Sequence, residues 1–296
     1  MSKKVIDVSS YQGKIDWAKV KASGVEGTIL KIIRKDLNPD KQFENNWSGC
    51  EKVGMPIVGV YNYSYATTIS KAIMDARKVI AILNGRKAKV WLDVENKVQK
   101  GLGVGLINII NAYKKEIESA GLEFGVYTGL SFYNSYIKPW YHMVNCNFWI
   151  ARYPYTGKVS LSYTPDAKKQ PGTKHTLEGW QFSSKGTIPG ISGSVDMNIW
   201  YGDIVTAGKQ EGNPYPVPER TLYLRKIRMR GEDVKWLQYH LIRLGFLAKL
   251  NRKGKNNIDG IYGVDTDNAV LAAQKHYGIE ADGIVGTVTR HVLRFN

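Results

Sequence analysis

Two carboxylates separated by one apolar residue close an apolar stretch of the sequence. Residues 89–96 read Lys-Val-Trp-Leu-Asp-Val-Glu-Asn, so Asp93 and Glu95 end a run that is typical of a buried strand. Residues two apart in a strand point to the same face, with α-carbons about 6.5–7 Å apart. Neighbouring carboxylates resist joint ionisation, so one can keep a proton and act as an acid while the other stays anionic. The two are therefore a candidate acid/base pair, although an isolated Asp-x-Glu is more often a solvated strand end.

Two further acids and a set of aromatic residues lie on other predicted strands. Asp7 lies near the end of the predicted strand 4–8, and Asp196 lies in the last predicted strand, 194–199. In a closed barrel the first and last strands are neighbours, and reacting groups come from the strand ends at one mouth. Carboxylates ringed by aromatic faces suit a site that grips and cleaves a sugar. The aromatic residues, which can line that mouth or fill the core, are Tyr61, Tyr63, Tyr127, Trp149 and Trp180.

The elements that must position these residues alternate between strand and helix in the first part of the chain. Strands are predicted at 4–8, 27–33, 56–63, 89–96, 124–127, 147–151, 177–182 and 194–199. Helices are predicted at 16–21, 43–53, 70–83 and 104–120, the first capped by Asp16 and the last stopped by Gly121. No helical pattern separates the last three strands. This order predicts an α/β fold, an irregular (β/α) barrel with few helices in its last third, rather than an open doubly wound sheet.

Four motifs, in this order along the chain, resemble the glycoside hydrolase family 25 lysozymes. They are Asp-Val-Ser-Ser-Tyr-Gln-Gly at 7–13 with Ile-Asp-Trp at 15–17, Gly-Val-Tyr-Asn-Tyr at 59–63, Asp-Val-Glu at 93–95 and Val-Asp-Met-Asn at 195–198. No single motif is specific, but together they form a strong signal over roughly residues 3–205. The resemblance implies a modified β/α barrel and the activity of an N-acetylmuramidase. Such an enzyme cleaves the β-1,4 bond between N-acetylmuramic acid and N-acetylglucosamine in bacterial peptidoglycan.

The resemblance also implies roles for individual residues. Glu95 corresponds to the general acid, and Asp93 to an anionic partner that stabilises the cationic transition state directly or by orienting the substrate's acetamido group. Asp7 and Asp196 correspond to further acids that hold this geometry or tune the pKa of Glu95. No cofactor and no metal are expected, because the five histidines show no ligand spacing. Substrate contacts are expected from Tyr61, Tyr63, Tyr127, Trp149 and Gln181.

The chain departs from the family pattern at two places on the expected cleft rim. After the second strand the family usually carries Lys, a small residue, Ser or Thr, Glu and Gly, where residues 31–35 read Lys-Ile-Ile-Arg-Lys. The family's Tyr-His-aromatic triplet is Tyr61-Asn62-Tyr63 here. All four acids are nevertheless present, which favours an active enzyme over a catalytically dead relative.

The last third of the chain predicts a second, small all-α domain with three helices. Residues 206–220 hold three of the ten prolines, so we expect a catalytic domain at 1–207, a Pro-rich linker at 208–220 and a binding domain at 221–296. An amphipathic helix is predicted at 231–245, and a repeat at 259–266 and 282–289 suggests that Thr266 and Thr289 cap helices 267–277 and 290–295. This pattern resembles peptidoglycan-binding modules of the PG_binding_1 type over about residues 222–294. The alternative is a helical dimerisation domain that makes a homo-oligomer.

The formal charge of +16 calls for an anionic partner. The basic residues are scattered through both halves, without an RNP-like strand, helix-turn-helix spacing or a zinc pattern, so we expect no nucleic acid. A bacterial cell wall, with its teichoic acids and peptide carboxylates, suits the same charge. Peptidoglycan is therefore the expected partner.

The N-terminus predicts a compartment. It shows no apolar signal-peptide region, and no stretch reaches transmembrane length, so neither export by the usual signal nor membrane insertion is expected. Cys50 and Cys146 are expected to be free thiols. These features suit a phage endolysin that stays in the host bacterial cytoplasm until lysis and then acts at the cell wall. The alternatives are a bacterial autolysin and a non-catalytic, lectin-like wall-binding protein.

Overall fold

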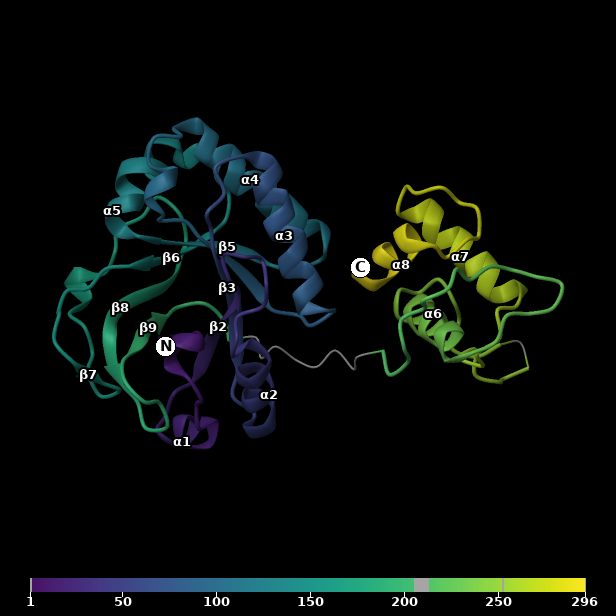
Figure 1. Ribbon diagram of the computed structural model, residues 1–296, viewed down its shortest axis with the longest axis horizontal. Helices are drawn as coiled ribbons and strands as arrows, with labels where there is room; N and C mark the ends of the chain where they lie inside the picture. Colours follow the sequence, from purple (N-terminus) through teal and green to yellow (C-terminus); the bar gives the residue numbers. More distant parts are fainter. Residues whose placement is uncertain (1, 205–212, 252, 296) are drawn as a thin grey trace. The chain divides into compact units, whose positions relative to one another are not determined.

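The chain forms two compact units, residues 1–208 and 209–296. The computed structural model describes residues 2–204, 213–251 and 253–295. Figure 1 shows the first unit as a ring of strands with helices outside it, and the second as a small group of helices. No helix in the described part of the chain combines the length and the apolar character that a membrane crossing needs.

Eight strands close the first unit into a barrel. These strands are β1 Lys3–Val8, β2 Gly27–Ile33, β3 Ile57–Tyr63, β4 Lys89–Asp93, β5 Phe124–Gly129, β6 Asn147–Ala151, β8 Leu177–Thr187 and β9 Val195–Trp200. The ring closes because β1 pairs with both β2 and β9, and β6 pairs with β8 (Figure 1). Neighbouring strands run parallel except β9, which is antiparallel to β1 and to β8. A two-residue strand that the sequence did not predict, β7 Val159–Ser160, pairs with the far end of β8.

Helices accompany only the early strands, which confirms the irregular barrel. They are α1 Trp17–Ala22, α2 Phe43–Val53, α3 Ile69–Leu83 and α4 Val104–Ser119, and α3 packs beside α4 (Figure 1). The Asp16 side chain accepts a hydrogen bond from the Lys19 N–H, so the predicted cap of α1 is confirmed. Between β5 and β6 lie the short α5 Leu130–Phe132, a π turn Tyr133–Ile137 and a 3₁₀ segment Lys138–Met143. From β6 to β9, the one helical turn among the described residues is the 3₁₀ turn Ala167–Lys169.

Three fully buried tryptophans fill the barrel interior. Trp91, Trp149 and Trp200 meet edge to face, with ring centroids 5.4–6.2 Å apart. Glycines on adjacent strands make room for them, because a Cβ on Gly125 would lie 2.3 Å from Trp91 and one on Gly179 would lie 2.4 Å from Trp200. Large and small side chains thus alternate around the ring, which lets the interior reach close packing.

Gly125→Ala is expected to destabilise the first unit by about 1–3 kcal/mol. The added methyl group fits only if the buried Trp91 ring moves. Gly105→Ala is the matched control, because Gly105 lies near the start of α4 with Leu102 Cβ, at 4.0 Å, as the nearest atom. Denaturant unfolding measures both variants, and equal stability of the two would contradict this packing.

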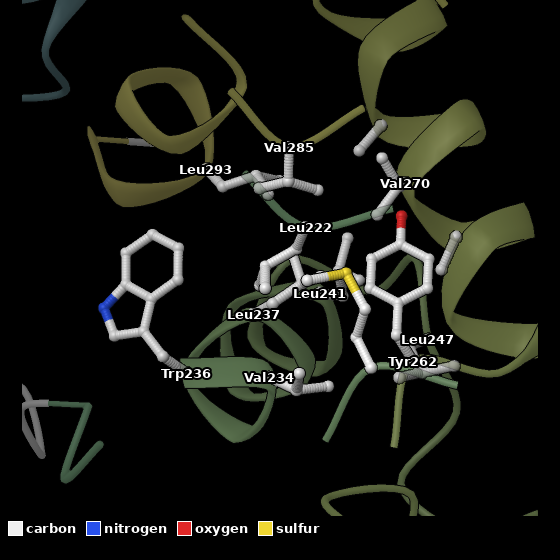
Figure 2. Close-up of a cluster of buried hydrophobic side chains, with 13 residues drawn as sticks. Leu222, Val234, Trp236, Leu237, Leu241, Leu247, Tyr262, Val270, Val285 and Leu293 are labelled. Carbon is white, nitrogen blue, oxygen red and sulfur yellow. The ribbon is translucent and has the colours of Figure 1, made fainter. Parts of the chain in front are cut away.

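The second unit is a three-helix domain with its own core. Its helices are α6 Glu232–Arg243, α7 Val264–His276 and α8 Thr287–Phe295, which confirms the predicted small all-α domain. Figure 2 shows the apolar side chains that meet between them, among them Leu237 and Leu241 of α6 and Val270 of α7. Isolated β-bridges also tie its loops together, pairing Leu222 with Val285 and Arg230 with Ile261.

The predicted linker 208–220 falls partly on residues 205–212, which lie outside the described part of the chain. Residues 213–220 pack on the second unit. The Asn213 side chain donates to the Trp236 carbonyl at 2.7 Å, and Tyr215 packs against the core of the helices. Arg220 pairs with Asp233 at 2.7 Å. The end of the proline-rich segment is therefore fixed to the three-helix domain by these contacts.

The sequence repeat builds two copies of one hydrogen-bonded clamp. In the first copy, the Gln238 side chain donates to Asp259, to the Ile261 carbonyl and to Thr266, at 2.8–3.3 Å. Its oxygen accepts the Gly260 N–H at 2.9 Å. In the second copy Gln274 makes the same four bonds with Asp282, Ile284, Thr289 and Gly283. Each loop of the repeat is thus held by a glutamine of the helix before it.

The prediction that Thr266 and Thr289 cap the following helices is wrong. Helix α7 begins at Val264 with Gly263 at its N-cap, and α8 begins at Thr287, so each helix starts before its threonine. Both threonines are buried, and their hydroxyls accept hydrogen bonds from the clamp glutamines. Each hydroxyl is therefore bonded to the preceding helix, and that of Thr289 also donates to the Ile284 carbonyl at 2.9 Å.

Gln274→Ala is expected to destabilise the second unit by about 2–4 kcal/mol, because it leaves the buried Gly283 N–H without its acceptor and removes three donated bonds. Asn268→Ala, at an exposed site of α7, is the control. Calorimetry of the full chain should show a lower transition temperature for the second unit only. An unchanged transition would show that the clamp does not hold the loop.

Candidate active site

Backbone hydrogen bonds to both neighbouring strands hold the end of β4 and the residue after it. They fix the position of the backbone from which the Glu95 side chain extends. The Ser64 N–H donates to the Asp93 carbonyl, and the Val94 N–H donates to the Tyr127 carbonyl, each at 2.9 Å. These bonds tie both peptide groups to the neighbouring strands β3 and β5. β4 ends at Asp93, so Glu95 lies two residues beyond the strand and not within it.

Asp7 and Asp196 are direct cross-strand partners. Because β9 runs antiparallel to β1, Asp196 comes from the beginning of its strand and Asp7 from the end of its own. The Asp196 carboxyl donates a hydrogen bond to Asp7. Asp7 also accepts from Gln181 at 3.0 Å and from Asn198 at 2.9 Å. The expected meeting of the first and last strands therefore occurs, through an antiparallel strand.

Burial raises the pKa of all four carboxyl groups. The pKa of Asp7 rises to about 6, and burial with the Asp7 charge raises the pKa of Asp196 to about 8. Burial, then the Glu95 charge, raises the pKa of Asp93 well above 3.8, while the Lys31 charge acts in the opposite direction. Burial raises the pKa of Glu95 as well. Each acid thus keeps its proton to a higher pH than a solvated carboxyl, as a general acid must.

A cleft of about 790 Å³ opens beside Glu95, at the ends of β5 and β6. Glu95 and Arg152 are the charged residues of its lining, and Tyr127 and Tyr153 are its aromatic residues. Gly129 lies next to the acid in this lining, and a Cβ there would make an ordinary contact with Glu95 Oε2 at 3.7 Å. The volume lies in the range of small-molecule binding sites, so a sugar unit can reach the Glu95 carboxyl.

Two of the predicted substrate contacts lie close to Glu95. Tyr127 lines the cleft, although its side chain is 7% exposed. Tyr63 is half-buried, and its hydroxyl accepts a hydrogen bond at 3.3 Å from Asn96, the residue after Glu95. Both tyrosines therefore stay candidates for sugar contacts.

The other three predicted contacts face the barrel interior. Trp149 is 1% exposed, and its ring N–H donates to Asn198 at 2.8 Å. The ring of Tyr61 packs against Trp149 with centroids 6.4 Å apart. Gln181 is 2% exposed and donates to Asp7. Trp149 and Gln181 make hydrogen bonds within the core and Tyr61 packs against Trp149, so these residues support the acids from the barrel interior.

Most of the residues that line the cleft were not predicted from the sequence, and Arg152 and Tyr153 are the charged and the aromatic residue among them. Arg152 and Tyr153 follow directly after β6. The Tyr153 hydroxyl donates to Gln181 at 2.6 Å, and so connects the cleft wall to the residue that holds Asp7. Both lie just beyond a strand end, as Glu95 does, and this position could have identified them. In the described part of the chain, no group of three or more His, Cys, Asp or Glu side chains could hold a metal ion.

The two departures from the family pattern have different consequences. Asn62 is buried, and its side chain donates to the Tyr113 hydroxyl of α4 at 3.3 Å. It therefore faces the helix layer, and its expected place on the cleft rim is wrong. Lys31, in the other departing stretch, lies over the Tyr61 ring at 5.7 Å, and its charge acts on Asp93.

Comparison with known proteins finds a family match for each unit. Glycosyl hydrolases family 25 matches residues 6–191, and PG_binding_1, a peptidoglycan binding domain, matches residues 230–293. The autolytic lysozyme of Clostridium acetobutylicum is 25% identical over 291 residues, 97% of this chain and 77% of that protein. The catalytic domain of endolysin ply40 from bacteriophage P40 of Listeria monocytogenes aligns with a TM-score of 0.56 and 25% identity, over 69% of this chain and 95% of that one. The modular autolysin LytC of Streptococcus pneumoniae aligns with a TM-score of 0.54 and 29% identity, over 68% of this chain and 47% of that one.

The two family matches fall on the two compact units. The first spans more than half of the chain and includes Asp7, Asp93 and Glu95. The second covers α6, α7, most of α8 and both copies of the glutamine clamp. The chain therefore belongs to glycosyl hydrolases family 25, as a lysozyme-type peptidoglycan hydrolase that carries a C-terminal peptidoglycan-binding domain.

Proposed function

We propose that this enzyme hydrolyses the β-1,4 bond between N-acetylmuramic acid and N-acetylglucosamine in peptidoglycan, with Glu95 as the general acid. The observation that carries the proposal is the position of Glu95, which lines the open cleft while burial raises its pKa. A carboxyl group that keeps its proton toward neutral pH can protonate the glycosidic oxygen as the bond breaks.

Asp93 is the proposed stabiliser of the positive charge that develops on the sugar. Its Oδ1 is buried and accepts no hydrogen bond from the described residues, and Asp93 is not among the residues that line the cleft. The Lys31 charge favours the carboxylate against the burial that raises the pKa of Asp93 in the free enzyme. Asp93 then acts on the cationic transition state directly, or orients the acetamido oxygen as an internal nucleophile.

Asp7 and Asp196 are the proposed positioning residues. Gln181 joins Asp7 to the cleft, because it donates to Asp7 and accepts from the hydroxyls of Tyr127 and Tyr153. The proton between the two aspartates keeps this chain of hydrogen bonds complete. The pair thereby fixes the wall that faces the substrate.

Purified peptidoglycan tests the proposed reaction. The enzyme should clear a suspension of cell walls and release new reducing groups at a matching rate. New amino groups without new reducing groups would mean that a peptide amide is cut, and would overturn the proposal.

The second unit is proposed to keep the enzyme on the wall by raising its effective concentration there. The match to a peptidoglycan binding domain over residues 230–293 supports this role. The full chain should stay on washed walls better than a chain that ends at residue 204, and better than it stays on DNA. Equal retention of the two chains would contradict a binding role for the second unit.

We propose a phage endolysin as the biological role, held in the host cytoplasm until the membrane is breached. The likeness to the endolysin ply40 catalytic domain supports it. The likeness to the autolytic lysozyme of Clostridium acetobutylicum over nearly the whole chain favours an autolysin as the second candidate. Expression in a susceptible bacterium separates the two. An endolysin should lyse the cells only after a pore-forming agent is added, whereas appearance in the medium of intact cells would favour an autolysin.

A further inference from the structure

Arg152 is fixed in the cleft by its backbone. Its N–H donates to the Gln181 carbonyl at 3.0 Å, and its carbonyl accepts the ring N–H of Trp180 at 2.8 Å. Both partners lie on β8, so the chain just beyond β6 is tied to the neighbouring strand. The side chain of Arg152 therefore starts from a rigid point of the cleft wall.

Most N–H donors of the Arg152 guanidinium are not used by hydrogen bonds to the described residues. Its Nη1 donates to the Gln170 carbonyl at 3.3 Å, and no carboxylate of the described residues pairs with it. A guanidinium offers five N–H donors, so one neutral acceptor leaves most of them for another group. Arg152 is thus a half-buried residue of the cleft lining whose charge no carboxylate of the described residues balances.

The Arg152 charge does not serve to tune Glu95. Burial is the cause that raises the pKa of Glu95, with no contribution from a neighbouring cation. Arg152 and Glu95 nevertheless line the same cleft of about 790 Å³. A cation that shares a cleft with the acid and has no protein anion as partner is placed to meet the substrate.

We propose that Arg152 is a specificity-determining residue that binds a carboxylate carried by the glycan strand next to the scissile bond. This inference rests on the proposed cleavage at N-acetylmuramic acid. Guanidinium and carboxylate match in shape, and their charge-assisted hydrogen bonds are among the strong ones. In peptidoglycan the carboxylate belongs either to the lactyl group of an unsubstituted muramic acid or to the stem peptide attached to it. N-Acetylglucosamine carries neither, so Arg152 would distinguish the two sugars.

The test combines a change in the enzyme with a change in the substrate. Intact peptidoglycan supplies stem-peptide carboxylates, and glycan stripped of its peptides by an amidase supplies lactyl carboxylates. Each is used as it is and after its carboxylates are converted to amides. For the wild type, masking the carboxylate that Arg152 binds should raise KM by roughly tenfold to a hundredfold and change kcat little. Arg152→Gln should show that higher KM on the unmasked substrate already, and masking should not raise its KM further.

Matched variants distinguish carboxylate binding by Arg152 from the effects of a lower net charge or of misfolding. Lys158→Gln removes an exposed cation outside the cleft lining and should respond to masking as the wild type does. Arg152→Lys keeps the charge and should recover part of the affinity. In a Glu95→Gln background, retention of soluble muropeptides reports binding without any turnover, so a slow variant still gives a result.

Two results would overturn the inference while leaving the muramidase proposal intact. One is an Arg152→Gln enzyme with the KM of the wild type. The other is a masking effect of equal size in wild type and Arg152→Gln on both substrates. Failure of the wild type to cut either glycan would instead overturn the proposed reaction, and the inference with it.

Discussion

Glu95→Gln is expected to lower the rate of peptidoglycan hydrolysis by about 10²–10⁴-fold, the usual contribution of a general acid. Glutamine has the size of the acid and can still hydrogen bond, but it has no proton to give to the leaving oxygen. Because the backbone beside Glu95 is held by bonds from Ser64 and to Tyr127, the variant should fold as the wild type does. Release of reducing groups from purified walls measures the loss.

The control for Glu95→Gln is Glu123→Gln, at a side chain that is 73% exposed. This variant should keep full activity. Glu95→Gln should still be retained on washed walls, since the second unit is unchanged. A Glu95→Gln enzyme that keeps a tenth or more of the wild-type rate would mean that another group donates the proton.

Asp196→Asn is expected to stabilise the first unit at alkaline pH, by about 3–5 kcal/mol at pH near 9. Burial and the Asp7 charge raise the pKa of Asp196 to about 8 in the folded chain, against 3.8 for a solvated aspartate. As the pH rises through this window the unfolded chain releases its proton first, so the wild type loses stability. Asparagine has no proton to lose, and its side-chain N–H can still donate to Asp7.

Thermal unfolding from pH 4 to pH 9 measures this effect. The variant should melt about 10 °C above the wild type at the alkaline end and at the same temperature near pH 4, where both side chains are neutral. Glu51→Gln, at an exposed acid of α2, is the control and should follow the wild-type curve. A variant with the pH slope of the wild type would show that Asp196 does not hold a proton in the folded enzyme.

Much of the barrel could be predicted because its strands are short apolar runs that end at polar residues. Asp7 and Asp93 were placed correctly at strand ends, whereas Glu95, predicted on the same strand as Asp93, lies two residues beyond it. The direction of β9 could not be read in the same way. An apolar run looks the same in either direction, so the antiparallel approach of Asp196 appears only in the fold.

The buried tryptophans show a second limit of the sequence. Trp149 and Tyr127 occupy equivalent strand positions, yet Trp149 lies in the interior layer and Tyr127 reaches the cleft. Trp149 fits into the interior beside Gly179, where a Cβ would lie 2.9 Å from the Trp149 ring. Pairing of distant strands decides this, and a pattern within one strand does not contain it.

The repeat in the second unit could be recognised in the sequence, but the hydrogen bonds that its residues make could not. A threonine before a helical pattern predicts a cap, whereas Thr266 and Thr289 bond to Gln238 and Gln274 of the preceding helices. Gln238 and Thr266 lie far apart in the chain and meet only when the helices pack. The capping rule, which considers only residues close in sequence, therefore predicted the wrong hydrogen-bond partners for both threonines.

The identity of the new chain ends is the most direct measure of whether Glu95 serves a muramidase. Walls digested by the wild type are reduced with borohydride, and the ends are identified by mass spectrometry. New ends should consist of reduced N-acetylmuramic acid, and they should be missing after incubation with Glu95→Gln. Reduced N-acetylglucosamine at the new ends, or the same new ends produced by Glu95→Gln, would contradict the assignment of the bond or of the acid.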